Sequence, residues 1–308
     1  MCKSEIYLNS QGPLVSIIIP TYKRSEMLPR AIESVLNQTY KNIQVIVVDD
    51  NDPDTEFRIA TEQRMLLYNY NPRVKYIRHE KNMNGSVARN TGIKNADGEI
   101  VAFLDDDDWY LPEKIEKQVE YLLAHTEFHA VYCGWNRDGC VVIPTEMGDL
   151  SYNILSGDHL IYTNVIMMWK QDAVACGGWD ETFMRHQEAA FMLRYFRGGG
   201  RIGVVSKSLV EFDVSDRSNV AGNPKKNEEQ TMHYLNSYSD ILEQCEKEKR
   251  GSKKKILLHR YRGMFLGYLK EKDYLGTFSF WCRYCKTVPI SFACCLMKYV
   301  FTRNVGKS

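Results

Sequence analysis

The chain has 308 residues, of which 44% are hydrophobic, a composition that excludes a disordered chain and suits one large domain or a core domain with an appendage. No apolar run reaches the ~18 residues that a membrane-spanning helix needs. The formal net charge is +1, but its distribution is uneven. From residue 247 to the end, 15 Lys and Arg residues stand against three acids, so this part is basic and the rest is acidic.

Strands alternate with helices in the first third of the chain. The predicted strands are short, apolar and rich in β-branched residues, as in strands buried on both faces. The segments between them have apolar residues at helical spacing. Strands are expected over residues 15–20, 43–48, 74–77 and 100–104, and helices over 27–38, 57–70 and 86–95. This alternation with short connections predicts an α/β fold with a parallel sheet and right-handed crossovers.

After residue 110 the pattern is less regular. Helices are expected over 114–124 and 186–196, strands over 130–133, 140–143 and 164–169, and edge strands over 202–205 and 208–212. Helices over 231–249 and 253–270 begin a basic, aromatic C-terminal part. The expected organisation is a polar leader (1–13), a core domain (14–212, with halves 14–110 and 111–212), a flexible loop (213–229) and a basic helical region (230–308).

Polar clusters follow three of the predicted strands. Thr21 and Tyr22 follow the first strand, Asp49 and Asp50 the second, and four aspartates at 105–108 the fourth. Ligands of parallel α/β sheets bind at the carboxyl ends of the strands. Four adjacent carboxylates repel one another, but they suit a divalent cation, which prefers hard oxygen ligands. The alternative for the acidic run is a solvated turn before the helix that begins near Pro112.

Six segments together resemble family 2 glycosyltransferases. They occur in order and at workable spacing over about residues 14–212, and they are Val15–Arg24, Val47–Asn51, Ala88–Ile93, Phe103–Trp109, Gly177–Glu181 and Arg185–Glu188. The resemblance implies the GT-A fold, a Rossmann-like, mostly parallel sheet flanked by helices, here with a helical C-terminal appendage.

The resemblance places a nucleotide-sugar donor at the strand ends. Asp50 is expected to hydrogen-bond the base, with Asp49 as the weaker candidate. Tyr22 offers a face for stacking, or is simply buried in its loop. Arg89 suits a phosphate or a base carbonyl, or forms a salt bridge on its helix. The expected donor-binding residues are Pro20, Thr21, Tyr22, Arg24, Asp50, Arg89, Asp105 and Asp106, and which of the last two contacts the ribose stays open.

A nucleoside diphosphate needs its charge neutralised before it can leave, and a divalent metal between carboxylate and phosphate oxygens does this. Asp107, the second acid of the D-x-D unit at 105–107, is the predicted ligand of Mn²⁺ or Mg²⁺. Asp108 is either part of this site or a helix N-cap. The sequence departs from the family at Asn84, where glycine is frequent, and Gly85 follows it.

An acceptor hydroxyl must lose its proton as it attacks the anomeric carbon, which calls for a carboxylate base. Glu188 matches the family's catalytic acid, more often Asp, although a carboxylate near a helix N-terminus is also favourable in itself. Asp180 and Glu181 are second choices for the base. Trp179, Asp180 and His186 are candidate acceptor-binding residues, with burial the alternative for Trp179 and helix capping for His186. A single base with in-line displacement implies inversion.

The basic C-terminal region either contacts an anionic membrane surface or forms solvated helices packed on the core domain. Its relevant residues are Lys253 to Lys255, Arg260, Arg262, Phe278, Phe280, Trp281, Phe292 and Phe301. Nine cysteines without an N-terminal signal sequence favour a cytoplasmic protein with reduced thiols, on the inner membrane face if the region binds lipid.

These features predict an inverting, metal-dependent transfer of a sugar from a nucleotide sugar, most readily a UDP-sugar, to a hydroxyl of a glycan or a lipid-linked acceptor in cell-surface polysaccharide biosynthesis. A sugar-phosphate nucleotidyltransferase is one alternative, but Pro20-Thr21-Tyr22 is not the glycine-rich basic loop that a triphosphate needs. A non-catalytic scaffold subunit that binds nucleotide sugars is the other. Nucleic acid is not an expected partner because the strand-end site is acidic.

Overall fold

The computed structural model describes residues 12–157, 161–215, 223–286 and 288–305. They form two compact units. The first comprises residues up to Leu150 together with Ile161–Asp216, and the second comprises Ser151–Leu160 and the chain from Arg217 onward.

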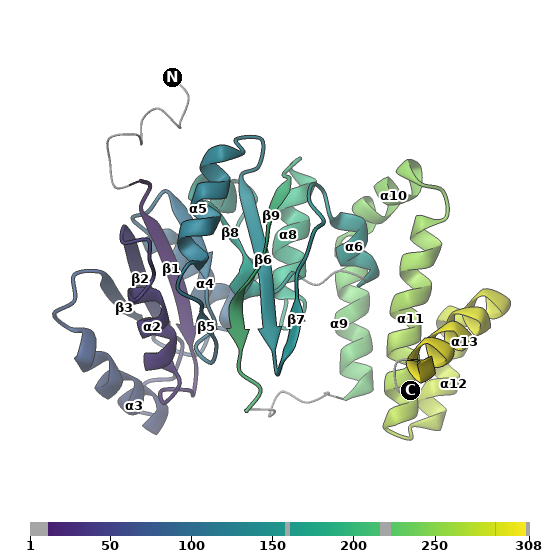
Figure 1. The fold of residues 1–308 in the computed structure, drawn as a ribbon. Coiled ribbons are helices and arrows are strands. Elements are labelled where there is room, and N and C mark those ends of the chain that lie inside the picture. The colour runs from purple at the N-terminus through teal and green to yellow at the C-terminus, as the bar shows by residue number, and fades with distance from the viewer. Residues whose placement is uncertain (1–11, 158–160, 216–222, 287, 306–308) are drawn as a thin grey trace. The chain divides into compact units, whose positions relative to one another are not determined.

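The first half of the first unit is a parallel sheet (Figure 1). Its strands are β1 (Val15–Thr21), β2 (Ile43–Asp49), β3 (Val74–Arg78) and β4 (Ile100–Phe103), in the order β3-β2-β1-β4. The intervening helices are α2 (Leu28–Leu36), α3 (Glu56–Met65, followed by the 3₁₀ turn η1, Leu66–Tyr68) and α4 (Gly85–Asn95). The β-branched strands β1 and β2 are almost wholly buried, as expected for central strands covered on both faces.

The second half extends the same sheet with strands of both directions, joined by antiparallel and parallel pairs. β8 (Met167–Trp169) pairs antiparallel with β4, and β6 (Ala130–Arg137), β9 (Ile202–Phe212) and β5 (Trp109–Tyr110) continue the order, with β7 (Cys140–Val142) paired to β6. The remaining helices are α5 (Lys114–Ala124), α7 (Lys170–Ala175) and α8 (Gln187–Arg197), and η2 (Thr163–Val165) precedes β8. The α/β prediction is confirmed.

The two predicted edge strands after residue 201 are wrong in detail. They form the single strand β9, which lies inside the sheet between β6 and β5, and the register shifts opposite Gly134 absorb the irregularity. The predicted strand over 164–169 is strand only from Met167, because residues 163–165 form the 3₁₀ turn η2. Local patterns do not reveal which strands a segment will pair with, so both errors arose where pairing is long-range.

A glycine brings α4 close to the sheet. A Cβ atom on Gly92 would lie only 2.3 Å from Cγ2 of Ile18 on β1, so no larger residue fits there without displacing the helix. This close approach fixes α4 against β1 and thereby fixes Arg89, one turn before Gly92, relative to the strand ends.

The second unit is helical. Its elements are α6 (Ser151–Ser156), α9 (Pro224–Ser237), α10 (Ser239–Glu248), α11 (Ser252–Lys270), α12 (Tyr274–Phe280), the π-helical turn η3 (Trp281–Cys285) and α13 (Pro289–Val305). The predicted helix over 231–249 is two helices, which meet at the buried Tyr238. The predicted loop over 213–229 lies partly outside the described residues, and its last six residues belong to α9.

The second unit has a core of its own, which corrects part of the predicted membrane surface. Phe280 and Phe292 are buried in a cluster with Met264, Tyr268 and Cys285 and are not surface residues. Arg260 donates hydrogen bonds to the carbonyls of Ile154 and Leu155 on α6, so it serves packing within this unit. The side chain of Phe301 lies outside the described residues. Among the described residues, no helix has the length and hydropathy of a bilayer span.

A buried ion pair supports the second strand. Asp49 at the end of β2 is fully buried, and its Oδ2 lies 3.2 Å from Nε of Arg58 on α3 and accepts a hydrogen bond from the Tyr76 hydroxyl. Arg58 also donates to the carbonyl of His79 at 2.7 Å. Asp49 is therefore held inside the protein, which makes it a packing residue in this structure.

Arg58→Met should destabilise the protein by about 3–5 kcal/mol, because it leaves the Asp49 carboxylate buried without its counter-charge. Arg64→Met is the matched control: it lies on the same helix, and its ion pair with Glu26 is on the surface. Denaturant unfolding should show a large shift for Arg58→Met and none for Arg64→Met. Equal midpoints for the two variants would contradict this role of the pair.

Candidate functional site

The four consecutive aspartates at 105–108 are each held by a different segment. Asp106 is buried and accepts hydrogen bonds from the Thr21 hydroxyl at 2.7 Å and from the Tyr22 amide at 3.3 Å, both at the end of β1. Burial raises the pKa of Asp106 to about 7, and the Thr21 hydroxyl opposes this rise. Asp106 therefore ties the acidic run to the loop after β1.

Asp108 points into the protein on the other side. It accepts hydrogen bonds from the Asn164 side chain and, at 2.7 Å, from the amide of Asp213, the residue that follows β9. Burial, together with the charges of Asp105 and Asp107, raises the pKa of Asp108 to about 8. Asp108 thus anchors the acidic run to η2 and to the end of β9. In this structure it is not the N-cap of α5, which begins at Lys114.

Asp105 and Asp107 are the more exposed pair. Their side chains are 33% and 19% exposed, against 5% for Asp106. Oδ1 of Asp105 lies 2.5 Å from Nη2 of Arg89, and Oδ2 of Asp107 lies 2.9 Å from Nη1 of Arg24. Alternate residues of the run therefore face solvent, and each faces an arginine.

Arg30 closes the site from α2. It donates to the Asp107 carbonyl and to the Asp213 carboxylate, both at 2.5 Å, and its guanidinium lies 4.2 Å from the centre of the Trp109 ring. Hydrogen bonds from Ser215, together with Arg30, lower the pKa of Asp213 to about 2. Arg30, Asn164 and Asp213 were missed in the sequence, because nothing local links them to the acidic run.

Asp50 organises the loop before α4. Its carboxylate lies 2.7 Å from Nδ1 of His79 and accepts hydrogen bonds from the Asn82 side chain at 3.0 Å and from the amides of Met83 and Asn84 at 2.8 and 2.9 Å. Asp50 is 3% exposed. It holds the segment 79–84 in this structure, and its predicted contact with a base stays a prediction.

The backbone of Asn84, where the sequence departs from the family pattern, keeps a conformation that suits glycine. Its φ of 92° and ψ of 161° lie in a region that glycine alone adopts easily, so the asparagine is strained here. The Asn84 side chain also accepts hydrogen bonds from the amides of Ser86 and Val87, so it caps α4. The hydrogen bonds of this cap offset part of the backbone strain at Asn84.

Arg89 joins the acidic run to α8. Besides Asp105, it donates to the Gln187 side chain at 3.0 Å, and its guanidinium lies 4.8 Å from the centre of the Trp179 ring. It is 7% exposed. The structure therefore places Arg89 between the predicted donor side of the site and the first turn of α8.

Glu188 lies in that first turn. Burial raises the pKa of its carboxyl group, the nearby Arg89 charge lowers it, and Asp105 raises it again. A carboxylate of raised pKa at the mouth of a charged site suits a general base better than one that is fully solvated. Glu188 lies within electrostatic range of Asp105, and its role as the base stays a prediction.

The three candidate acceptor residues have different surroundings. Trp179 is 1% exposed and stacks on Phe191 with ring centres 4.5 Å apart, which favours its burial as the alternative reading. Asp180 accepts two hydrogen bonds from Thr182 and pairs with Arg194 at 3.6 Å. His186 occupies the N-cap position of α8 with φ of 60°. Asn90 links this region to α4 through two hydrogen bonds with the Trp179 backbone.

Tyr22 is 40% exposed beside the acidic run, and Lys23 lies over its ring at 4.9 Å. An exposed ring at this position remains available for stacking.

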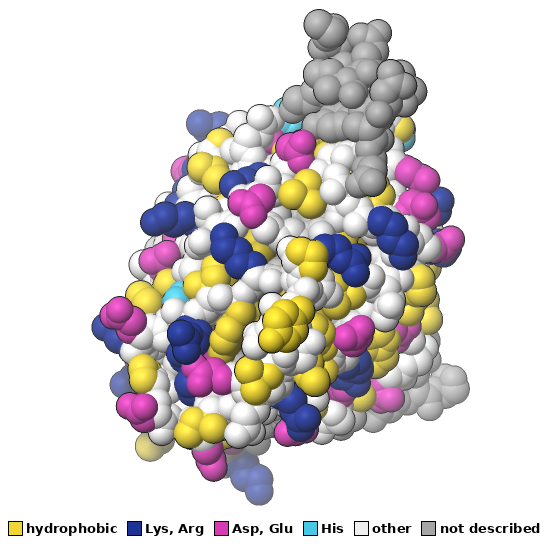
Figure 2. Space-filling model, turned by 90° about the vertical axis from the view of Figure 1, so that its left-hand side faces the viewer, with side chains coloured by type: hydrophobic (Ala, Val, Ile, Leu, Met, Phe, Trp, Pro, Cys, Tyr) yellow, Lys and Arg dark blue, Asp and Glu magenta, His cyan; other side chains and the backbone are white. Residues whose placement is uncertain are grey.

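Figure 2 shows the side of the molecule that carries α3 and β3, where basic and acidic side chains are interspersed and neither sign of charge forms a continuous patch.

The acidic run suits a metal shared with a ligand. Among the described residues, no three His, Cys, Asp or Glu side chains are placed to enclose a metal ion. Asp105 and Asp107 offer partly exposed oxygens. Mg²⁺ is commonly bound by one or two carboxylates, with substrate phosphates and water supplying the rest. The residues therefore fit a divalent ion held jointly by the protein and a diphosphate.

Comparison with known proteins identifies the family. The model of glycosyl transferase family 2 matches residues 16–189, more than half of the chain, and the chain belongs to this family. An uncharacterized glycosyltransferase of Rickettsia conorii is 35% identical over 146 residues, which are 46% of this chain and 22% of that protein. An uncharacterized glycosyltransferase of Haemophilus influenzae is 29% identical over 188 residues, 59% of this chain and 61% of that protein. The chain spans 22% to 38% of the length of three Rickettsia relatives.

The fold is that of the GT-A glycosyltransferases. The structure of S. aureus TarS 1–349 in complex with UDP-GlcNAc matches with a TM-score of 0.56, at 18% identity, over 83% of this chain and 66% of that one. The structure of the same protein in complex with UDP matches with a TM-score of 0.54. At this identity the likeness establishes a common fold.

Arg89→Met should raise the pKa of Glu188 further, because it removes the positive charge that opposes the effect of burial. An NMR titration of the Glu188 carboxyl carbon would measure the shift directly. Arg89→Lys keeps the charge and should restore most of the original value. A Glu188 pKa that is the same in the Met variant and the unaltered protein would contradict the coupling.

Proposed function

We propose that the chain is an inverting, metal-dependent glycosyltransferase that transfers a sugar from a nucleotide sugar to a hydroxyl group. The observation that carries the proposal is the alternation in the acidic run: Asp105 and Asp107 face solvent, while Asp106 and Asp108 anchor the run. This arrangement offers carboxylates to a metal–diphosphate group at the strand ends, where α/β sheets bind ligands.

A UDP-sugar is the proposed donor. TarS, which shares the fold, was solved in complex with UDP-GlcNAc and with UDP. In this chain Tyr22 would stack on the base, and Asp50 with its loop would bind the base edge. Pro20 and Thr21, the last two residues of β1, would position Tyr22, and Arg24 would contact the phosphates once the donor engages Asp107. Asp107, with Asp105, would hold Mn²⁺ or Mg²⁺, which supplies neutralisation of the departing diphosphate.

Glu188 is the proposed general base. It would take the proton from the acceptor hydroxyl as that oxygen attacks the anomeric carbon from the side opposite the diphosphate. Arg89 would favour the ionised form of Glu188, and its hydrogen bonds to Asp105 and Gln187 would position the first turn of α8 relative to Asp105. One base and one displacement give inversion. Asp180, His186 and the Trp179 segment would border the acceptor.

Asp107→Asn should abolish the Mn²⁺-dependent part of UDP binding, because an amide cannot replace the carboxylate as a ligand of a hard cation. Titration calorimetry with and without Mn²⁺ measures this. Asp97→Asn, at a surface turn before β4, is the control and should bind as the unaltered protein does. Metal-dependent UDP binding that survives in Asp107→Asn would remove this residue from the site.

Glu188→Gln should bind UDP and Mn²⁺ normally but transfer sugar at least 100-fold more slowly, because the amide cannot accept the proton. The assay is sugar transfer to an acceptor, or hydrolysis of the UDP-sugar where no acceptor is known. Turnover at the original rate would exclude Glu188 as the base.

The acceptor is proposed to be a glycan or a lipid-linked saccharide, with the second unit at an anionic membrane surface on the cytoplasmic side, in the assembly of a cell-surface polysaccharide. Support comes from α12 and the turn after it, where large apolar side chains are exposed at helical spacing. Their exposed fractions are 68% for Tyr274, 85% for Leu275, 66% for Phe278 and 36% for Trp281. Exposed lysines flank them at 270, 272 and 286, and the exposed acids Glu271 and Asp273 balance the first two. Aromatic side chains between lysines are typical of helices that lie in the membrane interface.

The double substitution Leu275→Ser and Phe278→Ser should weaken binding to phosphatidylglycerol vesicles at least tenfold, because each side chain gains about 1.5–3 kcal/mol from full burial in an apolar phase. Leu67→Ser with Tyr70→Ser is the matched control, since these residues of the first unit are 71% and 99% exposed. Vesicle sedimentation provides the measurement. Equal losses in the two double variants would refute a specific α12 contact.

A further inference from the structure

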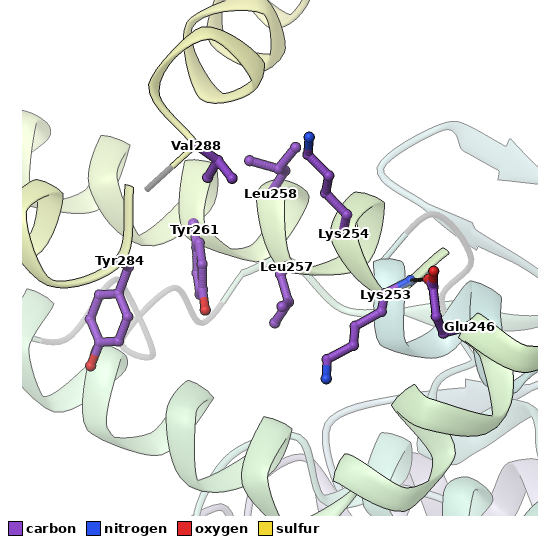
Figure 3. A pocket seen from close by; sticks show the side chains of 8 residues that line it. All are labelled: Glu246, Lys253, Lys254, Leu257, Leu258, Tyr261, Tyr284 and Val288. Carbon is purple, nitrogen blue, oxygen red and sulfur yellow. Dashed lines mark hydrogen bonds between the residues drawn. The ribbon is translucent and has the colours of Figure 1, made fainter. Parts of the chain in front are cut away.

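The second unit contains a groove along α11 that the proposed donor site does not use (Figure 3). It has a volume of about 370 Å³ and is lined by one face of α11, by Glu246 from α10, by Tyr284 from η3 and by Val288. This volume lies in the range of small-ligand sites. All of the lining residues belong to the second unit.

The floor of the groove is apolar. Leu257 and Tyr261, one turn apart on α11, point to one side of the groove and Leu258 points to the other (Figure 3), and Val288 lies at the same end as Tyr284, whose ring centre is 5.3 Å from that of Tyr261. From residue 253 to residue 261 the helix rises about 12 Å. The floor is therefore long enough for a short stretch of an extended hydrocarbon chain, roughly two to three isoprene units.

One end of the groove carries charged side chains, and only some of them have hydrogen-bond or ion-pair partners. Glu246 accepts hydrogen bonds from the amides of Gly251 at 2.8 Å and Lys253 at 3.0 Å, and the Lys253 ammonium pairs with Glu243. The amides of Gly251 and Lys253 lower the pKa of Glu246, so its carboxylate is already hydrogen-bonded by the turn before α11. Lys254 is exposed, and its ammonium group makes no hydrogen bond or ion pair with any residue that the structure describes. A single uncommitted ammonium group therefore lies at the end of an apolar floor.

We propose that this groove binds a lipid phosphate, with its hydrocarbon chain on Leu257, Leu258 and Tyr261 and its phosphate at Lys254. A free phosphate would leave the floor exposed to water, and an uncharged lipid would gain nothing from the ammonium group. A ligand with both parts satisfies both ends, and lysine binds phosphate as a point charge. The inference deepens the proposed function, on which it rests for its biological meaning: the groove would hold the lipid of a lipid-phosphate-linked acceptor.

Titration calorimetry of the full chain with farnesyl phosphate, below its micellar concentration and without nucleotide, tests the site. We expect saturable binding of one molecule. Lys254→Glu should weaken it at least tenfold. Lys255→Glu, the adjacent exposed lysine that does not line the groove, should change it less than twofold. Farnesol and inorganic phosphate should each bind at least tenfold more weakly than farnesyl phosphate.

Leu257→Glu provides a second variant, which should abolish binding by placing a carboxylate on the floor while circular dichroism confirms the fold. Three results would overturn the site: no saturable binding by the folded protein, equal losses in Lys254→Glu and Lys255→Glu, or binding of inorganic phosphate as tight as that of farnesyl phosphate. Binding to anionic vesicles without binding of farnesyl phosphate also counts against the groove and assigns lipid contact to the surface of the unit. The titration contains no sugar donor, so a negative result does not bear on the transferase proposal. Conversely, a protein that binds farnesyl phosphate but transfers no sugar counts against the transferase proposal and not against the groove.

Discussion

Holding four adjacent carboxylates in place is the constraint on which the site depends. Each carboxylate repels the next, and burial raises the pKa of Asp106 and of Asp108 well above the ordinary range. The fold compensates with partners from several segments. Asp105 is paired with α4, Asp106 with the end of β1 and the loop after it, Asp107 with Arg24 of the same loop, and Asp108 with η2 and the end of β9. The acidic run thereby joins segments that lie more than a hundred residues apart in the chain.

This division also separates the two proposed tasks. Arg24 and Asp107 lie on the side of the β1 loop, where a nucleotide would sit, and Arg89 connects Asp105 to the first turn of α8. Arg24 and Arg89 lie beside the carboxylates and reduce the repulsion between them. A bound metal would replace part of the positive charge that the arginines supply to the carboxylates. The phosphates of the donor would compete with those carboxylates for the arginines.

The parts of the site encoded locally could be predicted from the sequence, and the rest could not. β-Branched runs that end in acids place Asp50 and Asp105 to Asp108 at strand ends, because strand period and strand-end chemistry are local properties. Asn164, Asp213 and Arg30 take part only because β8 and β9 enter the same sheet, which no local pattern reveals. The same limit explains why the sequence leaves two alternatives open for Trp179, and for Phe280 and Phe292, all of which are buried in the structure. Whether an aromatic side chain is buried depends on its tertiary contacts, and the composition of the segment is the same at the surface and in the interior.

The most direct test of the account is calorimetric binding of UDP, GDP, dTDP and CDP to the unaltered protein, each with and without Mn²⁺. The account predicts that UDP binds, that Mn²⁺ strengthens this binding at least tenfold, and that the other nucleotides bind more weakly. Absence of binding of all four by the folded protein, in the presence of the metal, would contradict the assignment of the acidic run to a nucleotide-sugar site.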